Sequence, residues 1–307
     1  MKRRFLKFCT AFTLVVLLFG MSATGVHAET EPRGVSTPNA RAISRRELSL
    51  SYVPTRSVSA YRALTVYHNG ASLGNIGRLI NGEVYVGIRK FVESTTSLRV
   101  TYYSSTKTIT VTGGGHNISV SDGAFAIFAN GRVMFSRTPA VLMSDSRMYV
   151  PLSSLARALS ISHTSSGNRV DTRGNIRAVV SADKYYREDE VYWLSRIISA
   201  ESRGEPLLGQ IAVGNVILNR VKSSSFPNTI WGVIFDRKWG VQFSPVANGT
   251  VYNTPSATSV IAAKICLEGF TVSTDALYFI APQVISGSWI QKTREYSFTV
   301  NRHDFYL

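Results

Sequence analysis

The clearest hydrophobic pattern in the chain lies at residues 194–221, where apolar residues recur at the spacing of two consecutive helices. Gly204 interrupts the pattern and provides a stop signal for the first helix. Pro206 suits the first turn of a second helix over 207–221, because a missing N–H costs nothing there. The pattern therefore predicts two helices that meet at a tight corner.

Glu201 continues the apolar stripe of the first helix, which is predicted to start near Asp189 and carries Leu194 and Ile198. Burial of a carboxyl group disfavours its charged form and raises its pKa, as general acid catalysis requires. The plainer alternative is a glutamate that points into solvent at the helix end or pairs with Arg203. The pattern by itself leaves both interpretations open.

Residues 61–172 show a different pattern, with short alternating segments separated by Asn-Gly turns that are typical of strands. Residues 83–92 resemble residues 147–156, since in each a strand ends in Tyr-Val and leads into a short amphipathic helix. This internal repeat predicts one α+β domain built from a duplicated strand-strand-helix motif.

The segment 173–186 is predicted to be a linker that contains one strand-like piece, at 176–180. Because few of its residues can pack across it, we expect the last domain, 187–307, to fold alone. We expect that domain to be mainly helical, of α+β class, with a groove. Its further elements are expected to be a helix at 229–235, a loop at 236–249, a helix at 256–267 and a strand at 296–300.

Residues 1–28 have the features of a secretory signal peptide: a basic start, an apolar core over 8–21 and a small-residue cleavage site at Ala28. The apolar run is shorter than the roughly 20 residues that span a bilayer, although an uncleaved anchor is the alternative. Residues 29–60 lack apolar periodicity and are rich in Pro, Ser, Thr and Arg, which predicts a disordered tether. We expect the protein to be exported.

The chain is basic, with 34 basic and 19 acidic residues and a net charge of +15. Four basic residues lie in the signal segment, so the remainder has 30 against 19, a net charge of +11. Such a charge suits anionic polymers of a cell wall, but it is spread thinly along the chain, so a role in solubility alone is the alternative. No block of Lys and Arg is interleaved with aromatic residues, so we expect no nucleic-acid partner.

The numbers and spacing of cysteines and histidines argue against an internal disulfide and against a zinc site. Cys266 is the one cysteine outside the signal segment, so no internal disulfide is expected. It lies in an apolar helical run, which favours a buried filler over a nucleophile paired with His303. No histidines have the spacing of a zinc site, so we expect neither a metal nor a cofactor. Outside the signal segment the histidines are His68, His116, His163 and His303.

The last domain resembles the SleB/CwlJ family of cell-wall hydrolases, which includes spore cortex-lytic enzymes. The resemblance covers about residues 187–307. It is carried by Ser199-Ala200-Glu201-Ser202-Arg203-Gly204-Glu205-Pro206, Gly209-Gln210, Asn219-Arg220-Val221, Phe226-Pro227, Phe243-Ser244-Pro245-Val246, Ala276-Leu277-Tyr278, Trp289-Ile290 and His303-Asp304-Phe305. Ala281 departs from the pattern, because family members usually carry Asn before the Pro that follows Ala-Leu-Tyr.

The resemblance implies a lytic transglycosylase that cleaves peptidoglycan with a single carboxyl group. Glu201 would act first as acid and then as base, while the substrate's own hydroxyl attacks. The resemblance also implies Gln242, Ser244 and Tyr278 as polar groups that orient the sugar. The aromatic residues Tyr278 and Trp289 are expected to line the groove and stack on sugar faces, with core packing as the alternative. A two-carboxylate glycosidase would need a second acid. The candidates are Glu205, Asp236, Glu268, Asp275 and Asp304.

Residues 61–172 resemble the copper amine oxidase N-terminal-like domain, which implies a spacer or wall-binding module without chemistry. The name implies no copper here, and we expect His68 and His116 to be surface or turn histidines. Two further functions stay open: a non-catalytic wall-binding structural protein and a Cys/His peptidase. The substrate stays open between vegetative wall and spore cortex. The resemblance to cortex-lytic enzymes also implies a role in sporulation or germination.

Overall fold

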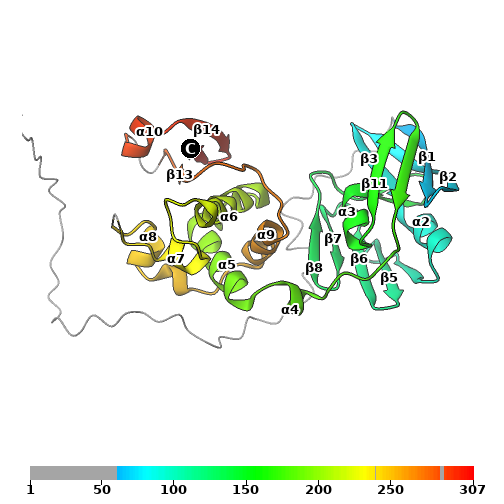
Figure 1. Ribbon diagram of the computed structural model, residues 1–307, viewed down its shortest axis with the longest axis horizontal. Helices are drawn as coiled ribbons and strands as arrows, with labels where there is room; N and C mark the ends of the chain where they lie inside the picture. Colours follow the sequence, from blue (N-terminus) through cyan, green and yellow to red (C-terminus); the bar gives the residue numbers. More distant parts are fainter. Residues whose placement is uncertain (1–60, 239, 284–286) are drawn as a thin grey trace, which may run out of the picture. The chain divides into compact units, whose positions relative to one another are not determined.

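The computed structural model describes residues 61–238, 240–283 and 287–307, coloured in Figure 1. The predicted signal segment, the tether and Trp239 lie outside the described residues. The described chain is of α+β class, as predicted. We call residues 61–173 the strand-rich part and residues 187–307 the helical part. No helix in the described ranges is long and apolar enough to cross a membrane.

The strand-rich part contains two sheets. The first has the order β11-β12-β1-β2-β3-β10-β9, and only its β1–β12 pair is parallel. Its strands are β1 (Arg62–His68), β2 (Ala71–Ile80), β3 (Glu83–Gly87), β9 (Val141–Leu142), β10 (Met148–Pro151), β11 (Ser162–Ser166) and β12 (Arg169–Arg173). The second sheet is antiparallel and comprises, in order, β4 (Arg99–Tyr103), β5 (Thr108–Gly113), β6 (His116–Ser121), β7 (Ala126–Ala129) and β8 (Arg132–Phe135).

The predicted repeat is confirmed. Strand β3 leads into helix α2 (Ile88–Thr95), and β10 leads into helix α3 (Leu152–Ala158). The two copies meet in one sheet, because β3 and β10 pair with Val150 opposite Val86. Their helices bury Phe91 and Leu155 in a core that also takes side chains from both sheets. The alternating pattern of the sequence therefore builds one core between two sheets.

The predicted strand at 176–180 is wrong, since no strand forms there. Asn130 holds this segment instead: its side-chain amide donates to Val179 O at 2.8 Å, and its backbone carbonyl accepts from Ala182 N at 2.9 Å. The segment thus fills its backbone hydrogen bonds against a turn rather than a sheet edge. It leads into the short helix α4 (Ala182–Tyr185).

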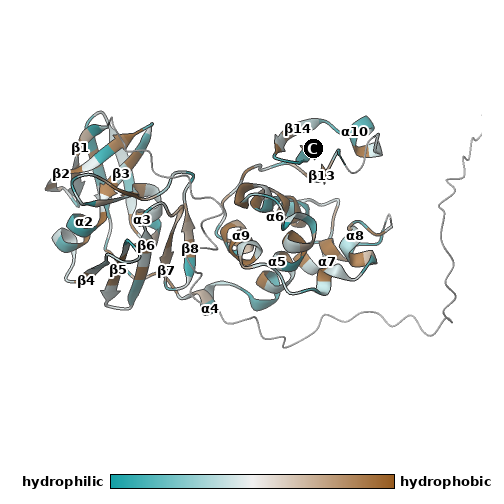
Figure 2. Ribbon diagram, turned by 180° about the vertical axis from the view of Figure 1, so that it is seen from behind, coloured by the Kyte–Doolittle hydropathy of each residue, from teal (hydrophilic) through white to brown (hydrophobic). Residues whose placement is uncertain are grey.

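The helical part is built on α5 (Glu188–Ser202), α6 (Leu207–Lys222) and α9 (Ala257–Leu267), which pack together (Figure 1). Figure 2 shows the hydrophobic residues that these helices carry. The helices predicted at 194–221, 229–235 and 256–267 and the strand at 296–300 are confirmed. The other elements are α7 (Ile230–Ile234), α8 (Ser244–Ala247), η2 (Thr250–Tyr252), β13 (Tyr278–Ile280), α10 (Trp289–Thr293), β14 (Tyr296–Val300) and β15 (His303–Tyr306).

Close packing of these three helices depends on Gly214 in α6. A Cβ atom at Gly214 would lie 2.7 Å from Cys266 Sγ of α9 and 2.8 Å from Ile198 Cδ1 of α5. Such contacts are too short, so glycine sets the approach of all three helices. Local signals set their starts: three acidic residues occupy the first turn of α5, and the Ser256 hydroxyl caps α9 by accepting from Ser259 N.

The expectation that few residues pack across 173–186 is wrong. Tyr186 is buried, and its hydroxyl donates to Glu268 Oε1 at 2.7 Å. Glu268, whose side chain is 1% exposed, also accepts two hydrogen bonds from Arg132 of β8, at 2.8 and 2.7 Å. Arg157 of α3 adds a third at 3.2 Å. One buried carboxylate of the helical part is therefore held by two arginines of the strand-rich part.

Apolar contacts extend the same interface. Ala126, Val133 and Phe135 of the second sheet belong to the hydrophobic core that α5, α6 and α9 form. The rings of Phe135 and Phe270 meet edge to face with centroids 4.6 Å apart. The helical part thus buries apolar surface against the strand-rich part, which favours coupled unfolding of the two parts. The expectation that 187–307 folds alone stays a prediction. The domain boundaries predicted from the sequence stay predictions.

We expect Glu268→Gln to lower the free energy of unfolding by about 3–5 kcal/mol, because it removes the counter-charge of two partly buried arginines. Urea unfolding measures the change. All four tryptophans lie in the helical part, so their fluorescence reports that part, while far-ultraviolet circular dichroism reports both.

The two probes should give one shared transition in the wild type. Glu93→Gln is the matched control, since it breaks the exposed pair of Glu93 with Arg89 in α2 and should cost only about 0.3–0.5 kcal/mol. Two separate transitions in the wild type, or an unchanged midpoint in Glu268→Gln, would contradict a shared folding unit.

Candidate functional site

The corner between α5 and α6 places Glu201 in the last turn of α5. The chain turns there through a bond from Glu205 N to Ser202 O at 2.8 Å, and Pro206 precedes the first residue of α6. The side-chain amide of Gln210 donates to Glu205 O at 2.9 Å. The corner is therefore closed by hydrogen bonds on both sides of Pro206.

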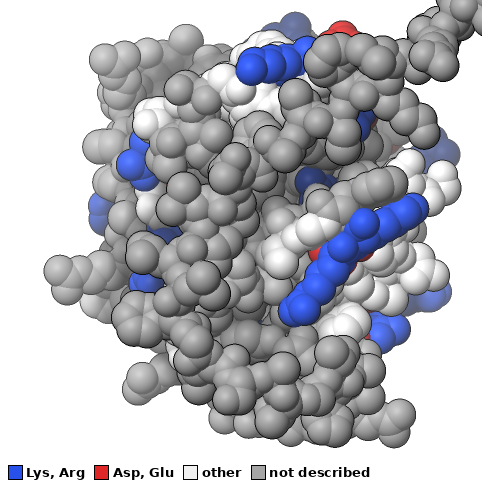
Figure 3. Space-filling model, turned by 90° about the vertical axis from the view of Figure 1, so that its left-hand side faces the viewer, with Lys and Arg blue, Asp and Glu red and all other residues white. Residues whose placement is uncertain are grey.

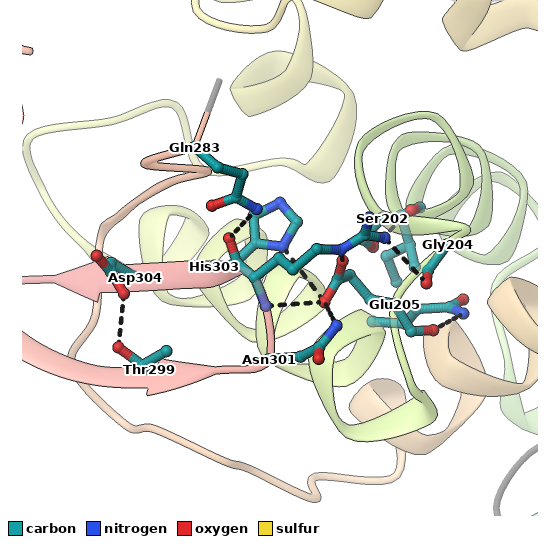
Figure 4. Close-up of polar contacts among 11 residues, drawn as sticks. Ser202, Gly204, Glu205, Gln283, Thr299, Asn301, His303 and Asp304 are labelled. Atoms are coloured by element: carbon teal, nitrogen blue, oxygen red, sulfur yellow. Dashed lines mark hydrogen bonds and ion pairs between the residues drawn. The ribbon is translucent and has the colours of Figure 1, made fainter. Parts of the chain in front are cut away.

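Glu205 fastens this corner to the β14–β15 hairpin (Figure 4). Its carboxylate accepts from Asn301 Nδ2 at 2.8 Å, from Arg302 Nε at 3.0 Å and from Arg302 N at 3.3 Å. Burial raises the pKa of Glu205, but these hydrogen bonds outweigh it, so the pKa lies below its ordinary value. His303 Nδ1 lies 3.7 Å from the same carboxylate. Glu205 is an anchor and does not serve as a second acid.

Glu201 differs from Glu205 in its surroundings. Burial raises the pKa of Glu201 to about 7, and the positive charge of Arg220 opposes that rise. No hydrogen bond joins its carboxyl group to another described residue. A glutamate with a pKa near neutrality can hold a proton and also release it. The geometry thus favours the acid interpretation over an exposed end or a pair with Arg203.

Arg220 of α6 is a buried guanidinium among aromatic rings. Its Cζ atom lies 4.9 Å from the Phe226 centroid, 5.2 Å from that of Phe243 and 5.3 Å from that of Tyr278. Its Nε donates to Leu277 O at 2.7 Å, whereas Nη1 is buried with no hydrogen-bond partner among the described residues. Burial lowers the pKa of Arg220 to about 10, so the group stays charged at neutral pH.

The polar face of α6 also fixes the segment that carries Tyr278. Asn215 Nδ2 donates to Phe270 O at 3.0 Å and its Oδ1 accepts from Val272 N at 2.7 Å. Asn219 Nδ2 donates to Ala276 O at 3.0 Å. These bonds hold residues 270–277 along α6 up to Tyr278, the first residue of β13.

Tyr278 and Trp289, both predicted to bind sugar, lie together. Their rings meet edge to face at 5.6 Å, and Arg294 Cζ lies 4.6 Å from the Tyr278 centroid and 5.5 Å from that of Trp289. Trp289 is 55% exposed, while Tyr278 is half-buried beside Arg220. The alternative that Trp289 packs in the core is therefore excluded.

Gln242 and Ser244 are the other two residues that are predicted to bind sugar. Gln242 Nε2 donates to Gly240 O at 3.1 Å, and Ser244 is the exposed first residue of α8. Neither is hydrogen-bonded to Glu201 within the described ranges. Phe243 between them is buried and faces Arg220, which places both residues beside the aromatic cluster.

The other candidate carboxylates have structural partners. Glu268 is bound by the strand-rich part, Asp275 accepts from Ser273 Oγ at 2.8 Å, and Asp304 accepts from Thr299 Oγ1. Asp236 is half-buried and interacts electrostatically with Arg220. No three His, Cys, Asp or Glu residues gather into a metal site in the part of the chain that the structure describes.

Cys266 does not pair with a histidine. Its thiol is buried between α6 and α9 and donates to Ile211 O at 3.4 Å. Burial raises the pKa of Cys266 far above the usual thiol range. His303 lies instead beside Glu205 and the Phe279 ring. The arrangement contradicts a Cys/His nucleophile.

Lys and Arg side chains form no single block on the face drawn in Figure 3, where they lie at several separate places among the described residues. Two individual arginines, Arg220 and Arg294, face the aromatic rings of the candidate site.

The sequence analysis gave no role to Arg220 or Arg294. Arg220 lies on one helical stripe with Val213 and Val216, and that charge on a buried face was the available signal.

Comparison with known proteins places the two parts separately. The family model described as Cell Wall Hydrolase matches residues 204–306, so its match begins just after Glu201. The model described as Copper amine oxidase N-terminal domain matches residues 75–170.

Three similar proteins each match part of the chain. A spore cortex-lytic enzyme of Bacillus cereus is 40% identical over 120 residues, 39% of this chain, and the chain spans 45% of that relative. The cell wall hydrolase CwlJ of Oceanobacillus iheyensis is 30% identical over 104 residues, 32% of this chain and 72% of the relative. The catalytic domain of the germination-specific lytic transglycosylase SleB from Bacillus anthracis is 38% identical, with a TM-score of 0.37, over 40% of this chain and 97% of that structure.

We expect Glu205→Gln to lower the free energy of unfolding near pH 7 by about 1.5–3 kcal/mol, because charge-assisted hydrogen bonds to Asn301 and Arg302 weaken. Since the folded pKa of Glu205 is below its ordinary value, this stability is present above that ordinary value and is lost as the pH falls through the folded pKa. Urea unfolding at several pH values should show the difference between wild type and variant shrinking in acid.

A double-mutant cycle with Arg302→Met is the control, since the two changes should be less than additive. Additive losses, or a difference that does not change with pH, would show that Glu205 does not anchor the hairpin through its charge.

Proposed function

This chain belongs to the cell wall hydrolase family, and on that premise we propose that it cleaves the glycan strands of peptidoglycan as a lytic transglycosylase. The proposal rests on Glu201, because this carboxyl group has a pKa near neutrality and interacts electrostatically with Arg220, which faces the Tyr278 ring. The relatives named as cortex-lytic enzymes and a lytic transglycosylase support the substrate class.

Glu201 acts first as a general acid. Its protonated carboxyl group gives a proton to the glycosidic oxygen as the bond to the muramic acid breaks and positive charge develops on the sugar. The carboxylate that remains accepts the proton of the muramic acid's own primary hydroxyl. The oxygen of that hydroxyl then attacks the sugar carbon whose bond to the glycosidic oxygen has broken. The product is an anhydro sugar, and Glu201 is protonated again.

The charge of Arg220 allows the Glu201 carboxyl group to act both as the acid and as the base. Burial alone favours protonated Glu201, and the guanidinium charge favours the carboxylate. Asp236 and the Tyr278 hydroxyl also face Arg220, and Arg294 lies over Tyr278. The balance of burial and charge keeps the pKa of Glu201 at about 7, where proton transfer in either direction is efficient.

Trp289, Tyr278, Gln242 and Ser244 supply the sugar contacts in this proposal. Trp289 offers an exposed ring on which a sugar face stacks, and Tyr278 joins that ring to the buried charge of Arg220. Export to the wall or spore cortex is part of the proposal, as is binding of anionic wall polymers to the basic chain. The proposed reaction needs no cofactor.

We expect Glu201→Gln to reduce peptidoglycan turnover by about 10²–10⁴-fold, because glutamine keeps the shape but cannot deliver a proton. Release of anhydro-muropeptides, followed by mass spectrometry, measures turnover. Glu188→Gln, in the first turn of the same helix, is the control and should keep activity.

Pull-down on insoluble peptidoglycan should show that Glu201→Gln still binds. Turnover by Glu201→Gln near the wild-type rate would remove Glu201 from the mechanism. Products with ordinary reducing ends would replace the transglycosylase with a hydrolase, and binding without turnover by the wild type would favour a structural wall protein.

We expect the activity of the wild type to fall as the pH rises above about 7, because Glu201 must be protonated to start the reaction. Arg220→Met removes the charge that lowers the pKa of Glu201, so the alkaline limb of the kcat profile should move to higher pH.

Arg220→Lys keeps the positive charge and is the matched control, since its alkaline limb should stay near that of the wild type even if kcat falls. A limb that does not move in Arg220→Met would contradict the electrostatic link between Arg220 and Glu201.

A further inference from the structure

Helix α10 and the residue that follows it form an exposed platform, and we call Trp289 and Arg294 together the Trp–Arg platform. Local hydrogen bonds fix both ends of this helix. At its start Ser288 N donates to Gln291 Oε1 at 3.0 Å and Gln291 N donates to Ser288 Oγ at 3.4 Å, which is a capping box. At its end Arg294 N donates to Ile290 O at 2.9 Å. The helix therefore defines the backbone position of both platform residues.

The guanidinium of Arg294 is held by aromatic rings and not by an acid. Its Cζ atom lies 4.6 Å from the Tyr278 centroid and 5.5 Å from that of Trp289, within the roughly 6 Å of a cation–π contact. Arg294 is exposed, and its side chain forms no ion pair or hydrogen bond with another described residue. Contact with rings uses no hydrogen-bond acceptor, so the N–H donors of the guanidinium stay available to a ligand.

The charges near the platform leave an excess of positive charge. Glu295 follows Arg294 and is exposed, yet it forms no ion pair within the described ranges. Glu205, on the α5–α6 corner, is already bound by Arg302 at 3.0 Å. Lys292 of α10 adds another exposed cation. An anionic ligand is therefore favoured over a neutral or cationic one.

Tyr278 connects the Trp–Arg platform to the surroundings of the proposed acid. Besides Arg294, its ring has the guanidinium of Arg220 near it, with Cζ 5.3 Å from the centroid. Arg220 in turn interacts electrostatically with Glu201. The platform is thus one aromatic ring away from Arg220, which suits a sugar of the same strand that Glu201 cleaves.

We propose that Arg294 binds a carboxylate on a muramic acid of the glycan strand, while a sugar face stacks on Trp289. Muramic acid differs from glucosamine by a lactyl branch, which ends in a carboxylate or in a peptide that carries one. A planar guanidinium matches a carboxylate through two parallel N–H···O bonds. The inference rests on the proposed function for its class of substrate. Arg294 is then a specificity-determining residue that selects strands with a charged branch.

Isothermal titration calorimetry on the whole chain with Glu201→Gln tests the proposal, since this variant is expected to bind glycan without turnover. The probe is a tetrasaccharide of alternating N-acetylglucosamine and N-acetylmuramic acid with free lactyl carboxylates. Its methyl ester is the neutral match, because it keeps every sugar and removes the charge. We expect the acid to bind about tenfold more tightly than the ester, and added salt to reduce this preference.

Substitutions at the platform, each added to Glu201→Gln, separate charge from stacking. Arg294→Gln should lower the affinity for the acid about tenfold and leave the affinity for the ester almost unchanged, so that the preference disappears. Trp289→Ala should weaken the binding of both forms, because stacking on a ring does not require the charge. Lys292→Gln is the matched control, since it removes an exposed charge from the same helix and should keep the preference.

A third probe distinguishes the two sources of the carboxylate. It is the same tetrasaccharide with an alanyl-glutamate dipeptide on each lactyl group, so its carboxylates lie on the peptide. Tighter binding than the free acid, with the gain lost in Arg294→Gln, would assign the peptide carboxylate to Arg294. Weaker binding than the free acid would assign the lactyl carboxylate.

Two outcomes would overturn the proposal. Equal affinities for the acid and the ester would make the platform blind to charge. An equal loss of preference in Arg294→Gln and Lys292→Gln would reduce it to an effect of net charge.

Turnover of peptidoglycan by the wild type is measured separately. Turnover without a preference for the acid would leave the proposed function standing without the carboxylate site. A preference without turnover would leave the carboxylate site standing while the proposed enzyme activity failed.

Discussion

The buried carboxylate of Glu205 is the interaction on which the geometry of the candidate site depends. This carboxylate joins the α5–α6 corner to Asn301 and Arg302 of the C-terminal hairpin. The backbone carbonyl of Glu205 accepts from the Gln210 side chain. A corner this tight has little freedom once both sides are bonded. Glu201, in the preceding turn, therefore has its position fixed by contacts that it does not make itself. A buried charge with three donors is expensive to form but rigid once formed.

Two glutamates four residues apart thus have pKa values shifted in opposite directions. Glu205 has several donors, which keep its pKa low, and Glu201 has no hydrogen-bond donor among the described residues, so burial raises its pKa to about 7. Arg220 connects the two halves of the site, because the same side chain holds Leu277 and faces Glu201 electrostatically. Helix α6 therefore holds the segment that leads to Tyr278, which we propose to bind sugar, and its Arg220 opposes the rise in the pKa of Glu201.

The strand-rich part is more than a spacer in this structure. Its arginines neutralise Glu268 at the end of α9, and its second sheet completes the core of the helical part. This packing makes the strand-rich part a support for α9.

Local patterns in the sequence determined the helices and most strands, because periodicity, caps and turns act within a few residues. The stripe through Leu194 and Ile198 located Glu201 on a buried face, and the Tyr-Val repeats located β3 and β10 before their helices. The strand predicted at 176–180 failed because an apolar run has strand character locally, while a hydrogen-bonding partner must come from elsewhere.

The tertiary structure alone decided which charges meet. Glu205 finds Arg302 and Glu268 finds Arg132, each pair far apart along the chain. No local period encodes such pairs, since they arise only when separate elements pack. Desolvation is equally non-local, because it depends on every group that covers a side chain. The sequence by itself therefore determined where an acid stands, and the fold decided whether that acid keeps its proton.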